Sequence, residues 1–248
     1  MDRMNAVIIA GTDGTSCVPG IANKALIPLC DRPMIEYVID AVRACKYIER
    51  VALISTQDVF DAVGGRVDVT VPQGESLMAN IGLCGQVFPE EDRIFVITGD
   101  VPLVTGAMLD DLIEQCGDPA VDFYYPILRM EDTLRLYPEA HRTSLRIREG
   151  KFTGGNAYVV RVNSIAPALE KTRLFVENRK KPWRIARIVG PDMLLRLAVG
   201  NLPLANIESR FQQFMQVNAK AVIARHPAIG NDVDKAEDVR MAQAHLMA

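Results

Sequence analysis

Short apolar runs alternate with amphipathic segments over the first 116 residues. The runs are rich in β-branched residues and stop at glycine or polar residues, which is typical of strands buried in a sheet. The segments between them carry apolar residues at the spacing of one helix face. We expect strands at 5–10, 51–54, 67–71 and 93–98, and helices at 33–42, 75–87 and 106–116. This alternation predicts an α/β fold with a mostly parallel sheet and helices on both faces.

The pattern changes after residue 120. We expect strands at 122–128, 145–148, 157–161 and 219–224, with an interruption at 153–156. Residues 163–216 are predicted to be largely helical, with breaks at Pro182, 190–191 and 200–203, and a helix over 235–247 closes the chain. Because the sequence has no repeat and no flexible linker, we expect a single domain over 1–248 with a mostly helical insertion at about 163–216.

The composition narrows the classes of protein. Of the 248 residues, 49% are hydrophobic and 24% are charged, which excludes wholesale disorder. A net charge of −3 argues against a dedicated nucleic-acid partner. No apolar run is long enough for a signal peptide or a membrane span. The five cysteines lack the spacing of a zinc site, so a reduced, cytoplasmic compartment is expected.

A glycine-containing loop after the first strand is the first candidate for chemistry. Its residues are Ala10, Gly11, Thr12, Asp13, Gly14 and Thr15, followed further on by Lys24. Glycines after a first parallel strand let backbone N–H groups approach phosphate oxygens, and a lysine can neutralise the same charge. The loop matches neither the dinucleotide fingerprint nor the Walker motif. An ordinary strand-to-helix connection is the alternative.

Aspartates form the second candidate. Asp100 follows a fully apolar strand and therefore lies at a carboxyl strand end, where open α/β sheets bind ligands. Mg²⁺ takes one or two carboxylates together with phosphate oxygens and water. The alternative for Asp100 is a turn residue, and for Asp232 and Asp234 it is helix capping, with Asp234 and Glu237 as a capping box.

Four segments resemble, in order, the motifs of sugar-nucleotide and MobA-like nucleotidyltransferases. They are residues 7–35 (VIIAGTDGTSCVPGIANKALIPLCDRPMI), QGESL at 73–77 with Asn80, GDVPL at 99–103 and NDVDKAED at 231–238. Together they span nearly the whole chain. The resemblance implies a glycosyltransferase-A-like fold, which is a Rossmann-like three-layer sandwich with a mostly parallel mixed sheet.

The resemblance also implies the reaction: Mg²⁺-dependent transfer of NMP from a nucleoside triphosphate to a small acceptor, with release of pyrophosphate. It carries over Asp100 and Asp232 as the metal pair, with Asp234 as the fallback, and Lys24 and Asp100 as the catalytic pair. Residues 10–15 and Lys24 would hold the phosphates. The base and ribose would meet Gln73, Gly74, Ser76 and Asn80. The acceptor, expected to be a phosphate monoester, would lie by Gly155 and Asn156.

Several residues depart from the family pattern. Ser16 stands where the family often has an arginine, Thr12 replaces a glycine, and Asn23 and Ala236 replace prolines. The lost arginine removes a bidentate phosphate donor that lysine does not fully imitate. Lys24 or a basic residue of the insertion could compensate. The insertion offers a basic stretch, which is alternatively a solvated face: Arg173, Arg179, Lys180, Lys181, Arg184 and Arg187.

Two other functions fit parts of the sequence. A glycosyltransferase of the same fold would use a nucleotide-sugar, but it usually carries an Asp-x-Asp where this chain has only Asp100. A degenerate nucleotide-binding regulatory module is motivated by Ser16 and Thr12. The base, whether cytidine, uridine or a purine, stays open, as do the acceptor and the oligomeric state.

Overall fold

The computed structural model describes residues 3–178 and 190–247. Within these ranges nine strands form one sheet, in the order β5-β4-β1-β6-β10-β7-β9-β8, with β11 paired to β7. The strands are β1 (Met4–Ile9), β4 (Ile48–Ser55), β5 (Val69–Pro72), β6 (Arg93–Thr98), β7 (Phe123–Arg129), β8 (Leu145–Ile147), β9 (Gly150–Gly154), β10 (Ala157–Arg161) and β11 (Ala219–Ile223). A separate small hairpin joins β2 (Pro28–Leu29) to β3 (Arg32–Pro33).

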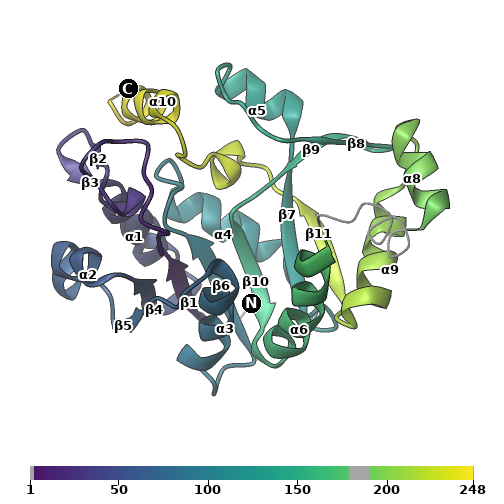
Figure 1. Cartoon of the computed structure of the whole chain (residues 1–248), viewed down its shortest axis with the longest axis horizontal. Coiled ribbons are helices and arrows are strands. Elements are labelled where there is room, and N and C mark those ends of the chain that lie inside the picture. The colour runs from purple at the N-terminus through teal and green to yellow at the C-terminus, as the bar shows by residue number, and fades with distance from the viewer. Residues whose placement is uncertain (1–2, 179–189, 248) are drawn as a thin grey trace.

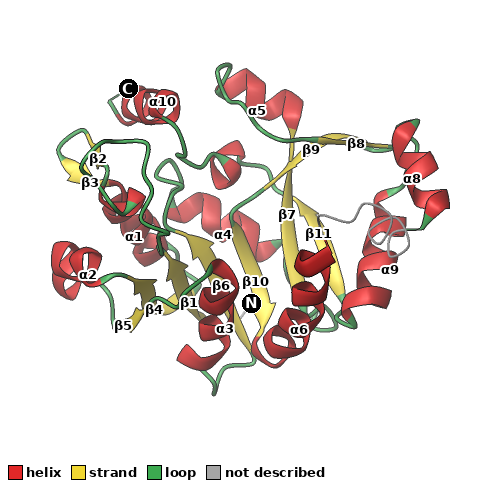
Figure 2. Ribbon diagram, in the orientation of Figure 1, coloured by secondary structure: helices red, strands yellow, loops and turns green. Residues whose placement is uncertain are grey.

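The sheet has a parallel half and a mixed half. Strands β5, β4, β1 and β6 run parallel to one another. Strand β10 pairs antiparallel with both β6 and β7, and β7, β9 and β8 continue the antiparallel pairing. Figure 2 shows the resulting sheet through the middle of the molecule, with helices around it. The predicted Rossmann-like, mostly parallel fold class is confirmed.

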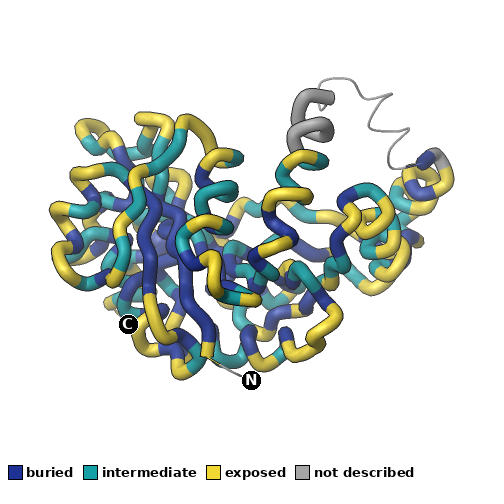
Figure 3. Tube along the Cα trace, turned by 90° about the horizontal axis from the view of Figure 1, so that it is seen from below, coloured by how far each residue is buried: buried dark blue, intermediate teal, exposed yellow. Residues whose placement is uncertain are grey.

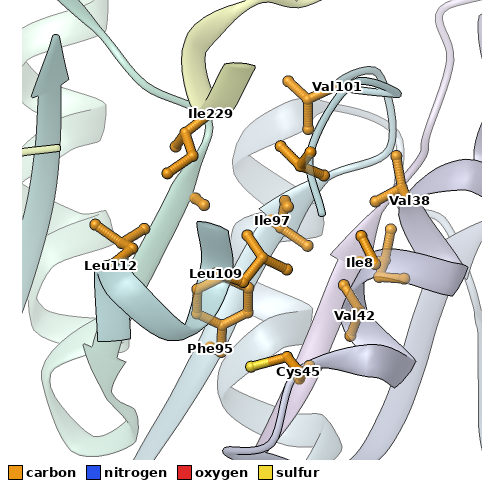
Figure 4. Close-up of a cluster of buried hydrophobic side chains, with 14 of the residues drawn as sticks. Ile8, Val38, Val42, Cys45, Phe95, Ile97, Val101, Leu109, Leu112 and Ile229 are labelled. Atoms are coloured by element: carbon orange, nitrogen blue, oxygen red, sulfur yellow. The ribbon is translucent and has the colours of Figure 1, made fainter. Parts of the chain in front are cut away.

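Helices cover both faces of the sheet. Helices α1 (Met34–Ala44) and α4 (Gly106–Glu114) pack on one face, and α3 (Leu77–Val87) and α6 (Val162–Asn178) on the other. Alternate residues of β1 serve the two layers, because successive side chains of a strand point to opposite faces. Ile8 packs toward α1 and α4 (Figure 4), whereas Val7 packs toward α3. The central strands β1, β4 and β6 are consequently among the most buried parts of the molecule (Figure 3).

The second half of the chain extends the molecule to one side. Helix α5 (Met130–Leu136) follows β7, and helices α8 (Pro191–Ala198) and α9 (Leu204–Met215) precede β11. Helix α10 (Ala236–Leu246) closes the described chain and lies at the same end of the molecule as α5 and the β2–β3 hairpin (Figure 1). None of the helices in the described ranges is long and apolar enough to cross a membrane.

Several short elements were not predicted, among them the β2–β3 hairpin, helices α2 (Gln57–Val63) and α5 and strand β9. Helices α2 and α5 have only seven residues each, too few to establish a helical period in the sequence. Strand β9 includes Thr153 and Gly154, although an interruption was expected at 153–156. The strand was missed because its two glycines hide the alternation of apolar and polar residues. The expected breaks at 190–191 and 200–203 are present at the starts of α8 and α9. The break at Pro182 lies outside the described residues.

Candidate active site

The glycine loop after β1 is fastened to the segment that follows β5. The side-chain amide of Gln73 accepts from the N–H of Thr12 at 2.7 Å and donates to its carbonyl at 2.9 Å. A Cβ at Gly11 would lie 2.5 Å from Asn80 Nδ2, so only glycine allows this approach. The side-chain oxygen of the buried Asn80 accepts from the N–H of Gly74 at 2.7 Å. Sequence segments about 60 residues apart therefore form one wall.

Part of the loop's hydrogen-bonding capacity is already used inside the loop. The N–H of Gly14 donates to Thr12 Oγ1 and the N–H of Thr15 donates to Asp13 Oδ1, both at 3.0 Å. The bonds from the Thr15 hydroxyl and N–H hold the pKa of Asp13 below its ordinary value. The N–H groups of Thr12, Gly14 and Thr15 thus have protein acceptors, and an incoming phosphate would have to replace them.

Asn23 stands where the nucleotidyltransferases that the sequence resembles have a proline, and its side chain makes several hydrogen bonds. Its buried side chain donates to the Ala10 carbonyl and to Thr56 Oγ1, both at 3.0 Å, and accepts from the N–H of Ala25. These bonds fix the chain direction immediately before Lys24, at the start of a short 3-10 helix over Lys24–Leu26. The side chain of Asn23 therefore anchors the loop that a proline would have stiffened.

Lys24 joins two aspartates from opposite ends of the chain. Its Nζ forms an ion pair with Asp100 and lies 2.7 Å from Asp234 Oδ1. Burial acts to lower the pKa of Lys24, but Asp100 and Asp234 outweigh burial and hold that pKa above its ordinary value. Lys24 is therefore a fixed positive charge at this point.

Asp100 is buried and is positioned by neighbouring strands. It follows β6, as the sequence predicted, and accepts from the hydroxyl of Thr98. Asn156 Nδ2 in turn donates to Thr98 Oγ1 at 3.0 Å. The carbonyl of Asp100 accepts from the N–H of Val233 at 2.9 Å, which brings the C-terminal aspartates beside it.

Three carboxylates meet at this place. One oxygen each of Asp100, Asp232 and Asp234 lies within 4.8 Å of the other two. Carboxylate oxygens at this separation suit a hard divalent cation such as Mg²⁺. The alternative capping role is filled by another residue, because Asp238 accepts from the N–H groups of Asp234 and Lys235 at the start of α10. The capping box of Asp234 with Glu237, considered as the alternative to metal binding, is therefore absent, and the Asp234 carboxylate instead contacts Lys24.

Arg142 is a site residue that the sequence analysis missed. It lies in the irregular segment between α5 and β8, pairs with Asp232 and donates to the Gly154 carbonyl at 3.2 Å. Burial lowers the pKa of its guanidinium, while Asp234 and Asp100 oppose that effect. No motif surrounds Arg142 in the sequence, and its pairing spans 90 residues of chain, so only the folded structure reveals it.

Two clefts meet at Asp234. The first, here named the loop cleft, has a volume of about 600 Å³ and is lined by the glycine loop, the start of α3, Lys24 and Asp100. The second, named the arginine cleft, has a volume of about 500 Å³ and is lined by residues 140–145, residues 152–154 and the C-terminal acidic segment. Asp234 lines both clefts, whereas Asp232 and Arg142 line only the arginine cleft among the described residues.

Most of the predicted base-side residues reach the loop cleft. Gly74, Ser76 and Asn80 line it, and Ser76 also caps α3 by accepting from the N–H of Ala79. A Cβ at Gly74 would lie 2.6 Å from that of Ala79, which explains the glycine there. Gln73 holds the loop from behind. Contact of these four residues with a base stays a prediction.

The Gly-Gly-Asn motif supports the site indirectly. Gly155 is buried, and its N–H donates to the Pro126 carbonyl at 2.9 Å. Gly154, the first residue of the motif, lines the arginine cleft, and Asn156 orients Thr98 and thereby Asp100. Contact of Gly155 and Asn156 with an acceptor remains a prediction. The basic stretch cannot be placed, because Arg179, Lys180, Lys181, Arg184 and Arg187 lie outside the described residues, as does the side chain of Arg173.

The sequence and the fold resemble those of known proteins. A hypothetical transferase from Thermus thermophilus is 32% identical, with a TM-score of 0.84 over 96% of this chain and 99% of that one. The bifunctional protein GlmU of Thermotoga maritima is 37% identical over 117 residues, which cover 45% of this chain and 25% of GlmU. At 12% identity, 4-diphosphocytidyl-2C-methyl-D-erythritol synthase from Anaerococcus prevotii has a TM-score of 0.63, covering 100% and 99% of the two chains, and shares the fold.

The mixed, mostly parallel sheet is of the Rossmann-like class, and it brings a glycine loop, a lysine and clustered aspartates together beside its strand ends, which is where such sheets bind ligands. Residues 6–171, more than half of the chain, match the MobA-like NTP transferase domain. The chain belongs to this family. It spans about a quarter of the length of the curated relatives it matches.

Proposed function

We propose that this protein transfers NMP from a nucleoside triphosphate to a small phosphorylated acceptor, with Mg²⁺ and with release of pyrophosphate. The observation that carries the proposal is the position of Lys24, whose ammonium contacts Asp100 and Asp234 where the glycine loop meets three clustered carboxylates. Family membership favours this function over the glycosyltransferase and the regulatory module.

The loop cleft is the place proposed for the nucleoside triphosphate. Its walls combine the loop from Gly11 to Thr15 with Gly74, Ser76 and Asn80, which offer backbone and side-chain donors for phosphates, base and ribose. The side chains of Thr12 and Asp13 would release the loop N–H groups as phosphate enters. Lys24 would neutralise the charge that develops on the leaving pyrophosphate.

The acidic cluster fits a divalent cation, since its donor set consists of carboxylate oxygens from three residues. Asp100 and Asp232 are proposed to hold it, with Asp234 as the fallback ligand. When bound, the cation would supply charge stabilisation to the phosphate undergoing attack. Thr98 and Asn156 keep the Asp100 carboxylate oriented for this task.

The acceptor is proposed to enter from the arginine cleft, which meets the loop cleft at Asp234. An oxygen of its phosphate attacks the α-phosphorus, the bond from that phosphorus to the bridging oxygen breaks, and pyrophosphate leaves. The protein's contribution is to position both substrates and to stabilise charge. Because residues from both ends of the chain build this site, we propose that residues 1–248 act as one catalytic domain. We also propose that the protein acts in the cytoplasm.

Pyrophosphate release measured with each of the four NTPs against a panel of sugar phosphates and polyol phosphates tests this function. One NTP and one class of acceptor should give Mg²⁺-dependent release. Asp100→Asn should reduce turnover by about 10²- to 10³-fold, because the site loses a charge that acts in the transition state. Asp58→Asn on exposed α2 is the matched control and should leave turnover unchanged. Full activity of Asp100→Asn would refute the role of the acidic cluster.

A further inference from the structure

Arg142 has no role in the reaction proposed above, yet its side chain is largely buried and held by specific contacts. Its side chain is only 15% exposed and that of Asp232 is 21% exposed. A charge removed from water is costly unless it is paired, so the contacts of Arg142 with Asp232 and the Gly154 carbonyl stabilise it in this position. A buried arginine facing a cleft calls for an explanation beyond surface solubility.

The surroundings of Arg142 suit a small anion. Thr143, Ser144 and Lys235 line the same cleft and add two hydroxyl groups and an ammonium group. The planar guanidinium presents paired N–H donors that match two oxygens of a phosphate. Arg142 lines the arginine cleft and not the loop cleft among the described residues, which separates it from the nucleotide's phosphates.

The charges explain why the anion and the metal ion would bind together. Asp100, Asp232, Asp234 and Asp238 carry four negative charges, and Lys24, Arg142 and Lys235 carry three positive charges in and around the cleft. An additional anion therefore meets no net positive charge in this arrangement. A divalent cation on the carboxylates would weaken the hold of Asp232 on Arg142 and leave a positive surplus.

We propose that Arg142 is the phosphate-binding residue of the acceptor subsite, and that it exchanges Asp232 for the acceptor's phosphate monoester when Asp232 turns to the divalent cation. The naming of the anion as the acceptor's phosphate rests on the proposed function. Since binding linkage is reciprocal, the cation and the phosphate each raise the affinity for the other by the same factor.

Titration calorimetry of the full chain with inorganic phosphate, with and without Mg²⁺, measures this exchange directly. In the wild-type protein Mg²⁺ should tighten phosphate binding about tenfold, within the usual range of coupling between sites. Arg142→Gln should remove this binding, and Arg142→Lys should retain part of it because the charge remains without the planar fork. Arg135→Gln, at an exposed position of α5, is the control and should behave as wild type.

Asp232→Asn tests the exchange itself. It removes the internal competitor, so it should bind phosphate more tightly than wild type without Mg²⁺ and gain nothing further when Mg²⁺ is added. Thermal melts verify that each variant is folded. Unchanged phosphate affinity in Arg142→Gln, or loss of the site only in Lys24→Gln, would overturn the proposal by placing the anion elsewhere. Equal behaviour of Asp232→Asn and wild type would overturn the exchange.

The two proposals fail separately, because phosphate binding is measured without turnover. Absence of pyrophosphate release with every substrate pair, together with Arg142-dependent phosphate binding, would refute the proposed reaction and leave the subsite intact. Normal turnover with a phosphate affinity that ignores Arg142 would refute the subsite alone.

Discussion

The loop cleft and the arginine cleft both contain a basic side chain paired with aspartate, but different interactions surround the two pairs. Each places one basic side chain on an aspartate, and they share Asp234 as a common wall. Around the loop cleft, side-chain amides of Gln73, Asn80 and Asn23 hydrogen-bond to the backbone of nearby segments. The polar positions of this cleft are therefore fixed mainly by hydrogen bonds.

The arginine cleft is shaped more by close packing. A Cβ at Gly154 would lie 2.1 Å from Tyr125 Oη, and one at Gly155 would lie 2.9 Å from Pro126 Cγ. Tyr125 and Pro126 belong to β7 and Gly154 ends β9, and these two strands pair antiparallel. The comparison shows that side-chain amide hydrogen bonds are concentrated around the loop cleft, which also contains close approaches at Gly11 and Gly74, whereas the arginine cleft lies against antiparallel strands.

The largest expected effect is a loss of activity when the positive charge of Lys24 is removed from the loop cleft. Lys24→Gln leaves Asp100 and Asp234 side by side without their shared cation and removes the charge that we propose faces the leaving pyrophosphate. We expect kcat/KM to fall by about 10²- to 10³-fold in a pyrophosphate-release assay. Lys151→Gln, exposed on β9, should leave it unchanged. A fall of less than about twofold would mean that Lys24 is structural.

Gly154→Ala tests the dependence of the arginine cleft on shape. The new methyl group collides with Tyr125, so urea denaturation should show a loss of about 1–3 kcal/mol of unfolding free energy. Removing the hydroxyl by Tyr125→Phe in the same chain should recover part of that loss. Gly117→Ala is the control, because a Cβ there meets no atom within 4 Å. Equal stabilities of the two alanine variants would contradict the packing argument.

Asn23→Ala tests the hydrogen bonds of the loop cleft. It removes one of the two donors to the buried Ala10 carbonyl, which keeps the Ser55 hydroxyl, and leaves the Ala25 N–H without its partner, so it should cost about 1–3 kcal/mol in the same denaturation assay. Asn206→Ala, exposed on α9, provides the comparison and should cost much less. If the two changes cost the same, the loop is not anchored by Asn23.

The mildest probe uses thiol chemistry. Burial raises the pKa of Cys45, Cys84 and Cys116 to about 12, so at pH 8 these groups are protonated and should react with a disulfide reagent only after unfolding. Exposed Cys30 should react at once in the folded protein. While the protein stays folded, the three buried cysteines should become reactive only as the pH rises toward 12, because the thiolate is the reacting form.

Cys17 sharpens the comparison between the clefts because it lines the loop cleft. A bound nucleoside triphosphate should slow its modification, whereas inorganic phosphate held at Arg142 should not. Cys30 serves as the internal reference in the same sample. Protection of Cys17 by phosphate alone would place the anion in the loop cleft.

The sequence motifs predicted most of the residues that line the loop cleft, but they did not predict Arg142 in the arginine cleft. Motifs around Gly11, Lys24 and Asp100 follow strands with clear patterns, so their order along the chain already predicted that they would meet. Arg142 belongs to a segment without a motif or a period, and its neighbours are set by the pairing of β7 with β9. Long-range packing of this kind leaves no local signal, which is also why the short helix α5 was missed.

The contact between Lys24 and Asp234 joins residues 210 positions apart. During synthesis the chain emerges from its N-terminal side, so the glycine loop and Lys24 exist long before the acidic segment that completes their surroundings. A nascent chain therefore carries the glycine loop that we propose holds the triphosphate before it carries the full set of carboxylates. The proposed catalytic centre is complete only when the last part of the described chain has folded onto the first.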